Sequence, residues 1–374
     1  MNTPAETQDA QVRSHIAALL VQRQNYREKI VALAAEHRYV VFYGCGAILN
    51  SIVDTWSEYV RRRIDFCCDT SPEKWGKVFS GIPCISPEEL LSMRGECAVF
   101  VTIGEFGPVY EFLTRSGVAS VNLIYKYDLV AADYLADHDD LEIAGKLATA
   151  RGLLSDQRSR EVFDAIIERV LGSGEDAGIM RRVCEPNQYF PADIIKLTEH
   201  ERFVDVGAFD GDTVKDLVAR TAGRFDHITC FEVDQANYGA LQETVNLLPC
   251  SDRITIHNLG VWDRECDIAY SVGKSQSTIG EGEARGHVVP LDDVLGNEPV
   301  SFIKMDIEGA EPQALRGAAQ IIRTRKPRLA VCVYHHIRHL WDIPFAIHEV
   351  VPEYKIYLRH HTNLEYETVC YAVA

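Results

Sequence analysis

The chain has 374 residues, of which 47% are hydrophobic and 25% charged, with 55 acidic residues against 38 basic ones. This composition is typical of a soluble globular protein, and the length favours two domains. The net charge of −17 would repel a phosphate backbone, so we expect no nucleic-acid partner.

Targeting and cysteine patterns favour a cytoplasmic location without a membrane span. We find no run of about 18 apolar residues, and the polar start of the chain is unlike a signal peptide. The 11 cysteines show no CxxC spacing, and several lie in apolar stretches, among them Cys230, Cys332 and Cys370. Buried, reduced thiols of this kind are typical of a reducing compartment.

Residues 1–36 are predicted to form an amphipathic helix. Acidic and basic residues mix on its polar side, so we expect it to pack on protein and not on a membrane. The apolar residues fall largely at helical spacing: Val12, Ile16, Leu19, Leu20, Ile30 and Leu33.

Residues 37–130 are predicted to form a smaller Rossmann-like α/β domain. A glycine turn, Gly44-Cys45-Gly46, follows the first buried strand, and Asp69 ends the second. This arrangement is typical of nucleotide-binding units, although Leu49 replaces the third glycine of the GxGxxG pattern. The domain either binds a nucleotide or nucleotide-sugar or only positions or dimerises the protein, so a homo-oligomer stays open. Strands are expected over 39–43, 64–68, 98–103 and 121–125.

Residues 131–186 read as a helical connector, and residues 187–374 as a second α/β domain. Two aromatic residues at its entrance, Tyr189 and Phe190, are interpreted either as packing or as a lid over a cofactor.

The second domain opens with a strand over 203–206 that leads into Gly207, where a ligand can approach the backbone. An acidic loop at a helix start argues against a pyrophosphate and suits a cationic ligand. The next strand, 228–231, ends at Glu232, which is placed to accept both hydroxyls of a ribose. A third strand, 254–257, ends at Asn258, which is suited to reading an adenine edge. Together these features predict S-adenosylmethionine, whose sulfonium is cationic.

A second acidic loop follows the strand over 302–305 and contains Asp306, Glu308 and Glu311. These carboxylates either bind a ligand at the carboxyl-terminal edge of the sheet or complement the dipole of the following helix. We expect the strands over 203–206 and 302–305 to be neighbours, so that both acidic loops form one cleft.

Four segments of this domain resemble the FkbM family of S-adenosylmethionine-dependent methyltransferases. The resemblance implies a seven-stranded class I methyltransferase sheet and O-methylation of a sugar or polyketide hydroxyl. Val233 departs from the family, which often has proline there. The segments are FVDVGAFDGDT (203–213), FEVD (231–234), VPLDDVL (289–295) and FIKMDIEGAEPQALRGA (302–318).

With the resemblance, the candidate cofactor-binding residues are Asp205, Gly207, Ala208, Asp210, Gly211, Thr213, Glu232, Asn258 and Glu308. Asp306 or His335 is the candidate base for the acceptor hydroxyl, unless His335 is only a satisfied histidine at a strand end. Lys304 is expected to pair with Glu308 or Asp306, or to orient the substrate.

A magnesium ion held by Asp306, Glu308, Asp292 and Asp293 stays open, against the simpler reading that Asp292 and Asp293 cap the helix that begins there. Strands over 354–359 and 368–373 are expected to complete the sheet. Arg359, His360 and His361 would then lie at a hairpin tip, either solvated or in contact with an acidic substrate.

The sequence thus predicts an S-adenosylmethionine-dependent O-methyltransferase that acts on a sugar or glycan-precursor hydroxyl. The alternatives are a non-catalytic nucleotide-binding or nucleotide-sugar-binding scaffold, or a bifunctional enzyme with separate nucleotide-sugar or redox activity in its N-terminal domain.

Overall fold

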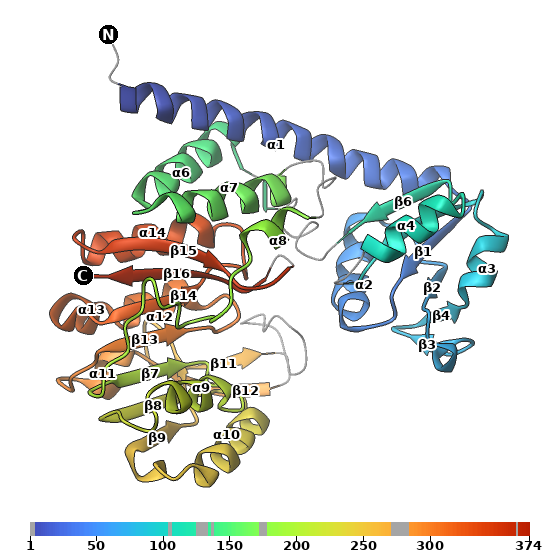
Figure 1. The fold of residues 1–374 in the computed structure, drawn as a ribbon. Helices are drawn as coiled ribbons and strands as arrows, with labels where there is room; N and C mark the ends of the chain where they lie inside the picture. Colours follow the sequence, from blue (N-terminus) through green and yellow to red (C-terminus); the bar gives the residue numbers. More distant parts are fainter. Residues whose placement is uncertain are drawn as a thin grey trace. The chain divides into compact units, whose positions relative to one another are not determined.

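A computed structural model describes residues 4–103, 107–124, 134–135, 138–171, 178–270, 284–363 and 366–374. The chain divides into two compact units (Figure 1). The N-terminal unit contains residues 1–148 and 165–182, and the C-terminal unit contains residues 149–164 and 183–374. The residues predicted to form a connector, 131–186, therefore contribute to both units.

The N-terminal unit contains a six-stranded sheet of order β3-β4-β2-β1-β5-β6, in which β3 pairs antiparallel with β4 and the other neighbouring pairs are parallel. Apolar residues of β1, β2 and β5 are buried on both faces of this sheet, as expected for parallel strands covered by helices. The strands are β1 (Tyr39–Tyr43), β2 (Phe66–Cys68), β3 (Val78–Phe79), β4 (Ile82–Ile85), β5 (Cys97–Val101) and β6 (Ser120–Leu123). The helices that lie wholly in this unit are α1 (Pro4–Glu36), α2 (Ala47–Tyr59), α3 (Pro87–Ser92), α4 (Gly107–Arg115) and the short 3-10 helix η1 (Pro72–Lys74).

Helices α6 (Asp140–Leu153), α7 (Gln157–Leu171) and α8 (Ile179–Val183) supply residues to both units. The strand end predicted at Tyr125 lies outside the described residues.

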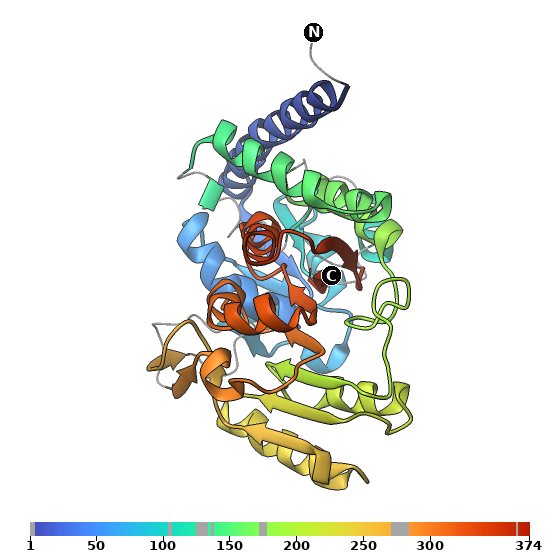
Figure 2. The ribbon, with the colours of Figure 1, turned by 90° about the vertical axis from the view of Figure 1, so that its left-hand side faces the viewer.

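The C-terminal unit is built on a seven-stranded sheet of order β15-β16-β14-β13-β7-β8-β9, which Figures 1 and 2 show from two directions. Strand β16 runs antiparallel to both of its neighbours, and the remaining pairs are parallel. The strands are β7 (Arg202–Val206), β8 (His227–Phe231), β9 (Ile254–His257), β13 (Phe302–Met305), β14 (Arg328–Cys332), β15 (Lys355–His360) and β16 (Thr368–Val373). The predicted α/β fold is confirmed for both units.

Strand order reverses between β7 and β13, because β8 and β9 extend the sheet on one side and β14 on the other. Ligands of open α/β sheets bind beyond the carboxyl ends of the strands at such a reversal. The sequence prediction that these two strands are neighbours is confirmed by their register, which pairs Lys304 with Asp205.

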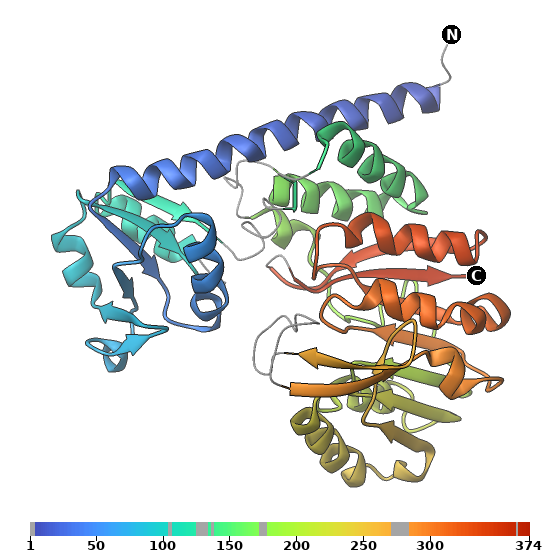
Figure 3. The ribbon, with the colours of Figure 1, turned by 180° about the vertical axis from the view of Figure 1, so that it is seen from behind.

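A second, three-stranded sheet lies in the same unit and was not anticipated from the sequence. Its order is β10-β12-β11, and β11 and β12 are drawn in orange in Figure 3. Its strands are β10 (Gly260–Val261), β11 (Cys266–Tyr270) and β12 (Ala284–Val289).

Helices of the C-terminal unit cover the large sheet. The first, α9, begins directly after the Gly207 loop, and α12 begins after the Asp306 loop. They are α9 (Asp212–Arg220), α10 (Gln235–Leu247), η2 (Ser251–Arg253), α11 (Leu291–Leu295), α12 (Glu311–Gly317), α13 (Ala319–Arg325) and α14 (His339–Val350). Within the described part of the chain, no helix combines the length and hydropathy needed to cross a bilayer.

Candidate functional site

The two acidic loops meet at the switch point of the large sheet. The Asp306 backbone amide donates to the carbonyl of Val206 at 3.0 Å. Gly207 has φ +82°, and a Cβ atom placed on it would lie 2.0 Å from the carbonyl oxygen of Asp306. A side chain at this position would therefore force the loops apart. The sequence prediction of one shared cleft is confirmed, and residue 207 must be glycine because the Asp306 loop approaches it so closely.

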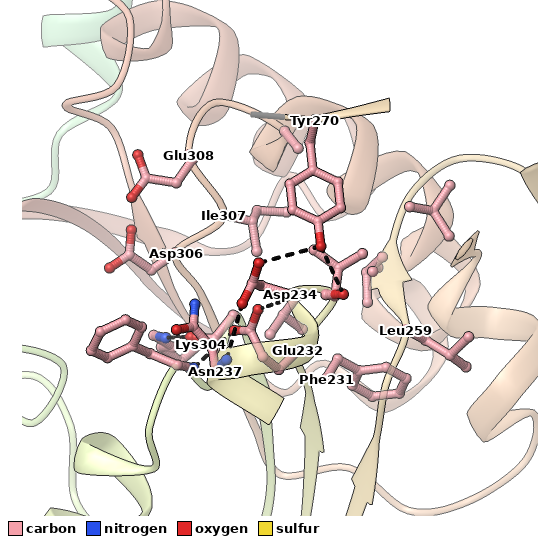
Figure 4. A pocket seen from close by; sticks show the side chains of 18 of the residues that line it. Phe231, Glu232, Asp234, Asn237, Leu259, Tyr270, Lys304, Asp306, Ile307 and Glu308 are labelled. Carbon is pink, nitrogen blue, oxygen red and sulfur yellow. Dashed lines mark hydrogen bonds between the residues drawn. The ribbon is translucent and has the colours of Figure 1, made fainter. Parts of the chain in front are cut away.

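A cavity of about 560 Å³ opens at this junction, a volume within the range of small-molecule sites. Asp306 and Glu308 lie on one side of it, and Phe231 and Leu259 on the other (Figure 4). The cavity is therefore acidic at one end and largely apolar at the other.

Glu232 lies at the end of β8 and lines the cavity with a largely buried side chain. Its Oε2 accepts the amide of Phe209 at 2.9 Å, and its Oε1 accepts the amide of Asp234 at 2.8 Å. Burial raises the pKa of this carboxyl group. Each oxygen keeps a further lone pair for a ligand hydroxyl, so the position suits the predicted ribose contact.

Asp306 is oriented by three neighbouring side chains. The hydroxyl of Tyr189 donates to Oδ2 at 2.7 Å, and the hydroxyl of Tyr334 donates to Oδ1 at 3.1 Å. The Nε2 atom of His335 lies 3.4 Å from Oδ1. Tyr189 also lines the cavity, which shows where one of the two aromatics flagged at the domain entrance lies.

His335 lies among carboxylates, with its side chain only 3% exposed. Its Nδ1 is 2.9 Å from Oε1 of Glu311, and its Nε2 is 3.5 Å from Oε2 of Glu308. Although burial disfavours the imidazolium ion, the Glu311 carboxylate raises the pKa of His335 to about 9. Burial likewise opposes ionisation of Glu311, but His335 lowers the pKa of Glu311 to about 2. His335 and Glu311 therefore form a buried ion pair at neutral pH.

Two further groups of this cluster are shifted by burial. Burial raises the pKa of Glu308 to about 7 and lowers the pKa of His339 to about 4. Glu308 has φ +55°, a conformation that a non-glycine residue adopts at a cost. His339 is thus neutral where His335 is charged, and Glu308 changes its charge near neutral pH.

Lys304 pairs with Asp205, and the sequence prediction of Glu308 or Asp306 as its partner is wrong. Its Nζ lies 3.0 Å from Oδ1 of Asp205 and donates to the Gly207 carbonyl at 2.6 Å. Strand register explains this choice, because Lys304 and Asp205 are directly paired on β13 and β7. Burial raises the pKa of Asp205 to about 6, whereas Asp205 and Asp306 raise that of Lys304 in spite of burial.

Four of the nine candidate cofactor residues line the cavity, and five do not. The lining residues are Gly207, Thr213, Glu232 and Glu308, whereas Asp205, Ala208, Asp210, Gly211 and Asn258 lie outside the lining. Among those five, Asp205 and Asn258 contact residues that line the cavity. Asp205 is fully buried against Lys304, and the Asn258 side-chain amide donates to the carbonyl of Glu232 at 2.8 Å.

The four carboxylates proposed to hold magnesium are not assembled. Both oxygens of Asp292 accept backbone amides of α13, from Gln320 and Ile321, each at 2.9 Å. Neither Asp292 nor Asp293 lines the cavity. The helix that Asp292 caps is therefore α13, and not the one in which it lies.

Several lining residues escaped the sequence prediction. Tyr270 of β11 donates to Oδ2 of Asp234 at 3.3 Å (Figure 4), and Ile268 lies on the same strand. Phe209 and Asn237 also line the cavity. The alternation of apolar residues around Tyr270 could have predicted its strand. Asp234 was part of the FEVD segment but was not named as a candidate site residue.

Arg359, His360 and His361 do not form an exposed hairpin tip, so that expectation is wrong. Arg359 is 2% exposed, and its Nη2 donates to Asp156 at 2.8 Å and to Asp193 at 2.6 Å. Residues 149–164 of the same unit cover strand β15. From this segment, the hydroxyl oxygen of Ser159 accepts a hydrogen bond from the backbone amide of Leu358.

In the N-terminal unit, the glycine turn after β1 is hydrogen-bonded to Asp69, the residue that follows β2. Oδ2 of Asp69 accepts the Cys45 amide at 3.0 Å and the Lys74 ammonium at 2.7 Å. Burial opposes ionisation of the Asp69 carboxyl group, but the contact with Lys74 lowers its pKa. An ionised carboxylate at the turn disfavours a pyrophosphate there, and a nucleotide-sugar in this unit stays a prediction.

Comparison with known proteins supports the geometry. The chain resembles a crystal structure of methyltransferase FkbM from Methylobacillus flagellatus KT, with a TM-score of 0.78 at 22% identity over 99% of both chains. A putative rRNA methylase from Clostridium thermocellum has a TM-score of 0.32 at 9% identity, covering 54% of this chain and 95% of the other. That similarity is too weak to support a functional conclusion. No curated protein matches the chain significantly.

A family model, the methyltransferase FkbM domain, matches residues 205–362 and so includes both acidic loops, Glu232 and His335. Residues 205–362 of this chain therefore match the methyltransferase FkbM domain, and the chain shares the fold of the FkbM methyltransferase from Methylobacillus flagellatus KT.

Proposed function

We propose that this methyltransferase transfers a methyl group from S-adenosylmethionine to a hydroxyl of a sugar or glycan precursor. The observation that carries the proposal is the cavity at the β7–β13 switch point, with Asp306 and Glu308 on one side, Phe231 and Leu259 on the other, and Glu232 between them. When bound, the donor supplies a methyl group on a positively charged sulfur.

The residues present fit this donor. The buried Glu232 carboxylate would accept the ribose hydroxyls, and the apolar side chains of Leu259, Val261 and Ile268 would contact the adenine ring. Glu308 would attract the donor's amino group. The acidic end of the cavity suits a cation, because it contains two carboxylates that face the same space.

Asp306 is the proposed base. Methyl transfer is an in-line displacement, so a fixed carboxylate both orients the acceptor hydroxyl and takes its proton as the new oxygen–carbon bond forms. His335 was the alternative, but with a pKa of about 9 it already carries a proton at neutral pH. We assign it instead as a positioning residue that holds the carboxylates of Asp306 and Glu311.

The proposal of a sugar acceptor rests on the family resemblance. We further propose a cytoplasmic location and no nucleic-acid partner. We also propose the division into a helix (1–36), a Rossmann-like domain (37–130), a connector (131–186) and the methyltransferase domain (187–374), with homo-oligomer formation as a further expectation. The predicted four-carboxylate magnesium site is not used in this mechanism, because Asp292 accepts two backbone amides of α13 and neither Asp292 nor Asp293 lines the cavity.

Ligand-dependent thermal shifts test the donor. S-adenosylmethionine at 100 times its Kd should stabilise the protein by about 2.7 kcal/mol, and Glu232→Ala should abolish most of that shift. Glu232→Gln keeps the size of the side chain, and Glu243→Ala on the exposed side of α10 is the matched control. No shift of the wild-type protein with this donor would remove the proposal.

The rival functions give different patterns in the same assay. A shift with a UDP-sugar or NAD that leaves the S-adenosylmethionine shift intact indicates a bifunctional enzyme, whereas a shift without donor turnover indicates a scaffold. For the base, Asp306→Asn should lower the methyl-transfer rate about 10²-fold or more while donor affinity survives. Unchanged turnover would refute Asp306.

A further inference from the structure

Three cysteine sulfurs of the N-terminal unit lie within 4.8 Å of one another. They belong to Cys45, in the turn after β1, to Cys67 on β2 and to Cys84 on β4, and all three residues are buried. Cys67 and Cys84 are directly paired in the parallel β2–β4 register, so their side chains lie on the same face of the sheet. The Sγ atom of Cys45 lies 3.4 Å from the Sγ atom of Cys84.

The three thiols come from segments separated in sequence, and each is placed by a different constraint. Cys45 is fixed because its amide donates to Asp69, which in turn binds Lys74. Cys68, the next residue after Cys67, points to the opposite face and belongs to another apolar cluster. Among the described residues, three cysteine sulfurs, and not four, therefore lie around one point.

The surroundings of Cys45 favour a thiolate once a cation is present. Cys45 directly precedes Gly46, the N-cap of the 13-residue helix α2, whose N-terminal end is electropositive. The Lys74 ammonium lies 3.5 Å from the Cys45 carbonyl. Without a cation, the hydrogen bond with Cys67 and burial raise the pKa of Cys45, and burial and the hydrogen bond with Cys45 raise the pKa of Cys84.

We propose that Cys45, Cys67 and Cys84 bind one soft, thiophilic metal ion of the copper(I) class through three sulfur ligands. Soft thiolate ligands favour copper(I) and zinc, but a structural zinc site is tetrahedral and needs a fourth ligand. The nearby carboxylate of Asp69 is engaged by Cys45, Ser71 and Lys74 and does not supply one. On binding, each ligating sulfur exchanges its proton for a bond to the metal, and the protons pass to the buffer.

Competition with a chromogenic copper(I) chelator tests the site on the reduced, full-length protein under anaerobic conditions. The wild-type protein should withdraw one copper(I) ion per chain from the chelator. Cys45→Ser, Cys67→Ser and Cys84→Ser should each weaken binding more than about 100-fold, because loss even of an outer partner costs about 10–100-fold. Cys68→Ser, on the other face of the same strand, is the matched control and should bind as the wild-type protein does.

Native mass spectrometry and X-ray absorption of the wild-type protein keep the test decisive if a serine variant does not fold. One copper per chain with three sulfur neighbours supports the site. No copper uptake by the wild-type protein, or equal loss in the Cys68→Ser control, overturns it. Preferential uptake of zinc, or a mass two hydrogen atoms lower that shows an oxidised Cys45–Cys84 disulfide in place of metal binding, also overturns it.

Discussion

The buried ion pair between His335 and Glu311 should make stability fall as pH rises above neutrality. Replacing both residues, as His335→Gln with Glu311→Gln, removes both titrating groups and leaves the net charge of the cluster unchanged. The pKa of His335 is about 9 in the folded protein, against an ordinary value of 6.5. A difference of this size corresponds to about 3 kcal/mol of stability.

The sign follows from proton binding. Between pH 6.5 and 9 the folded protein keeps the His335 proton and the unfolded chain loses it, so the free energy of unfolding falls as pH rises. The contribution is fully present below pH 6.5 and is lost as pH rises through 9. Glu311, with a pKa of about 2, stays ionised throughout this window and adds no slope.

Urea unfolding at a series of pH values measures the effect. The stability difference between the wild-type protein and the double variant should shrink by about 3 kcal/mol from pH 6 to pH 10. His339→Gln is the matched control: His339 belongs to the same cluster, but its pKa of about 4 makes it neutral in the folded protein, so its removal should leave the fall in stability above neutral pH unchanged. A difference that stays constant with pH would refute the proposed charge of His335, and with it the assignment of Asp306 over His335 as the base.

Three further outcomes follow from buried contacts. Lys304→Met should cost about 3–5 kcal/mol in urea unfolding because it leaves Asp205 buried without its cation, and adding Asp205→Asn should recover part of the loss. Additive losses would contradict the pairing. Gly207→Ala should cost at least about 2 kcal/mol and abolish the thermal shift with S-adenosylmethionine, because its Cβ would meet Asp306. Full retention of donor binding would disprove the close approach. Arg359→Leu should cost about 1.5–3 kcal/mol, because it removes the buried guanidinium that binds the partly exposed carboxylates of Asp156 and Asp193, and a change below about 0.5 kcal/mol would contradict these contacts.

The part of the site set by strand order was predictable from the sequence. Gly207 and Asp306 each follow an apolar strand, and the carboxyl ends of parallel strands meet at one edge of the sheet. The pairing of β7 with β13 then brings their loops together, as expected. Glu232 was found in the same way, because it ends the neighbouring strand.

Register and tertiary cover were not predictable in this way. Asp205 was expected to contact the cofactor, but a register that pairs it with Lys304 turns it into an internal counter-ion. Asn258 was expected to face the adenine ring, yet its amide is used by the carbonyl of Glu232. Arg359 looked like a loop residue because its carboxylate partners, Asp156 and Asp193, are distant in sequence.

The contact between Gly207 and the Asp306 carbonyl has a consequence for engineering this enzyme. The loop assigned to the methyl donor contacts the loop assigned to the acceptor through Gly207 and Asp306. Substitutions that move the backbone of one loop will therefore also displace the other. Attempts to broaden acceptor choice should therefore keep the backbone at residues 207 and 306 and draw diversity from positions such as Ile268 and Tyr270, which reach the cavity from a separate sheet.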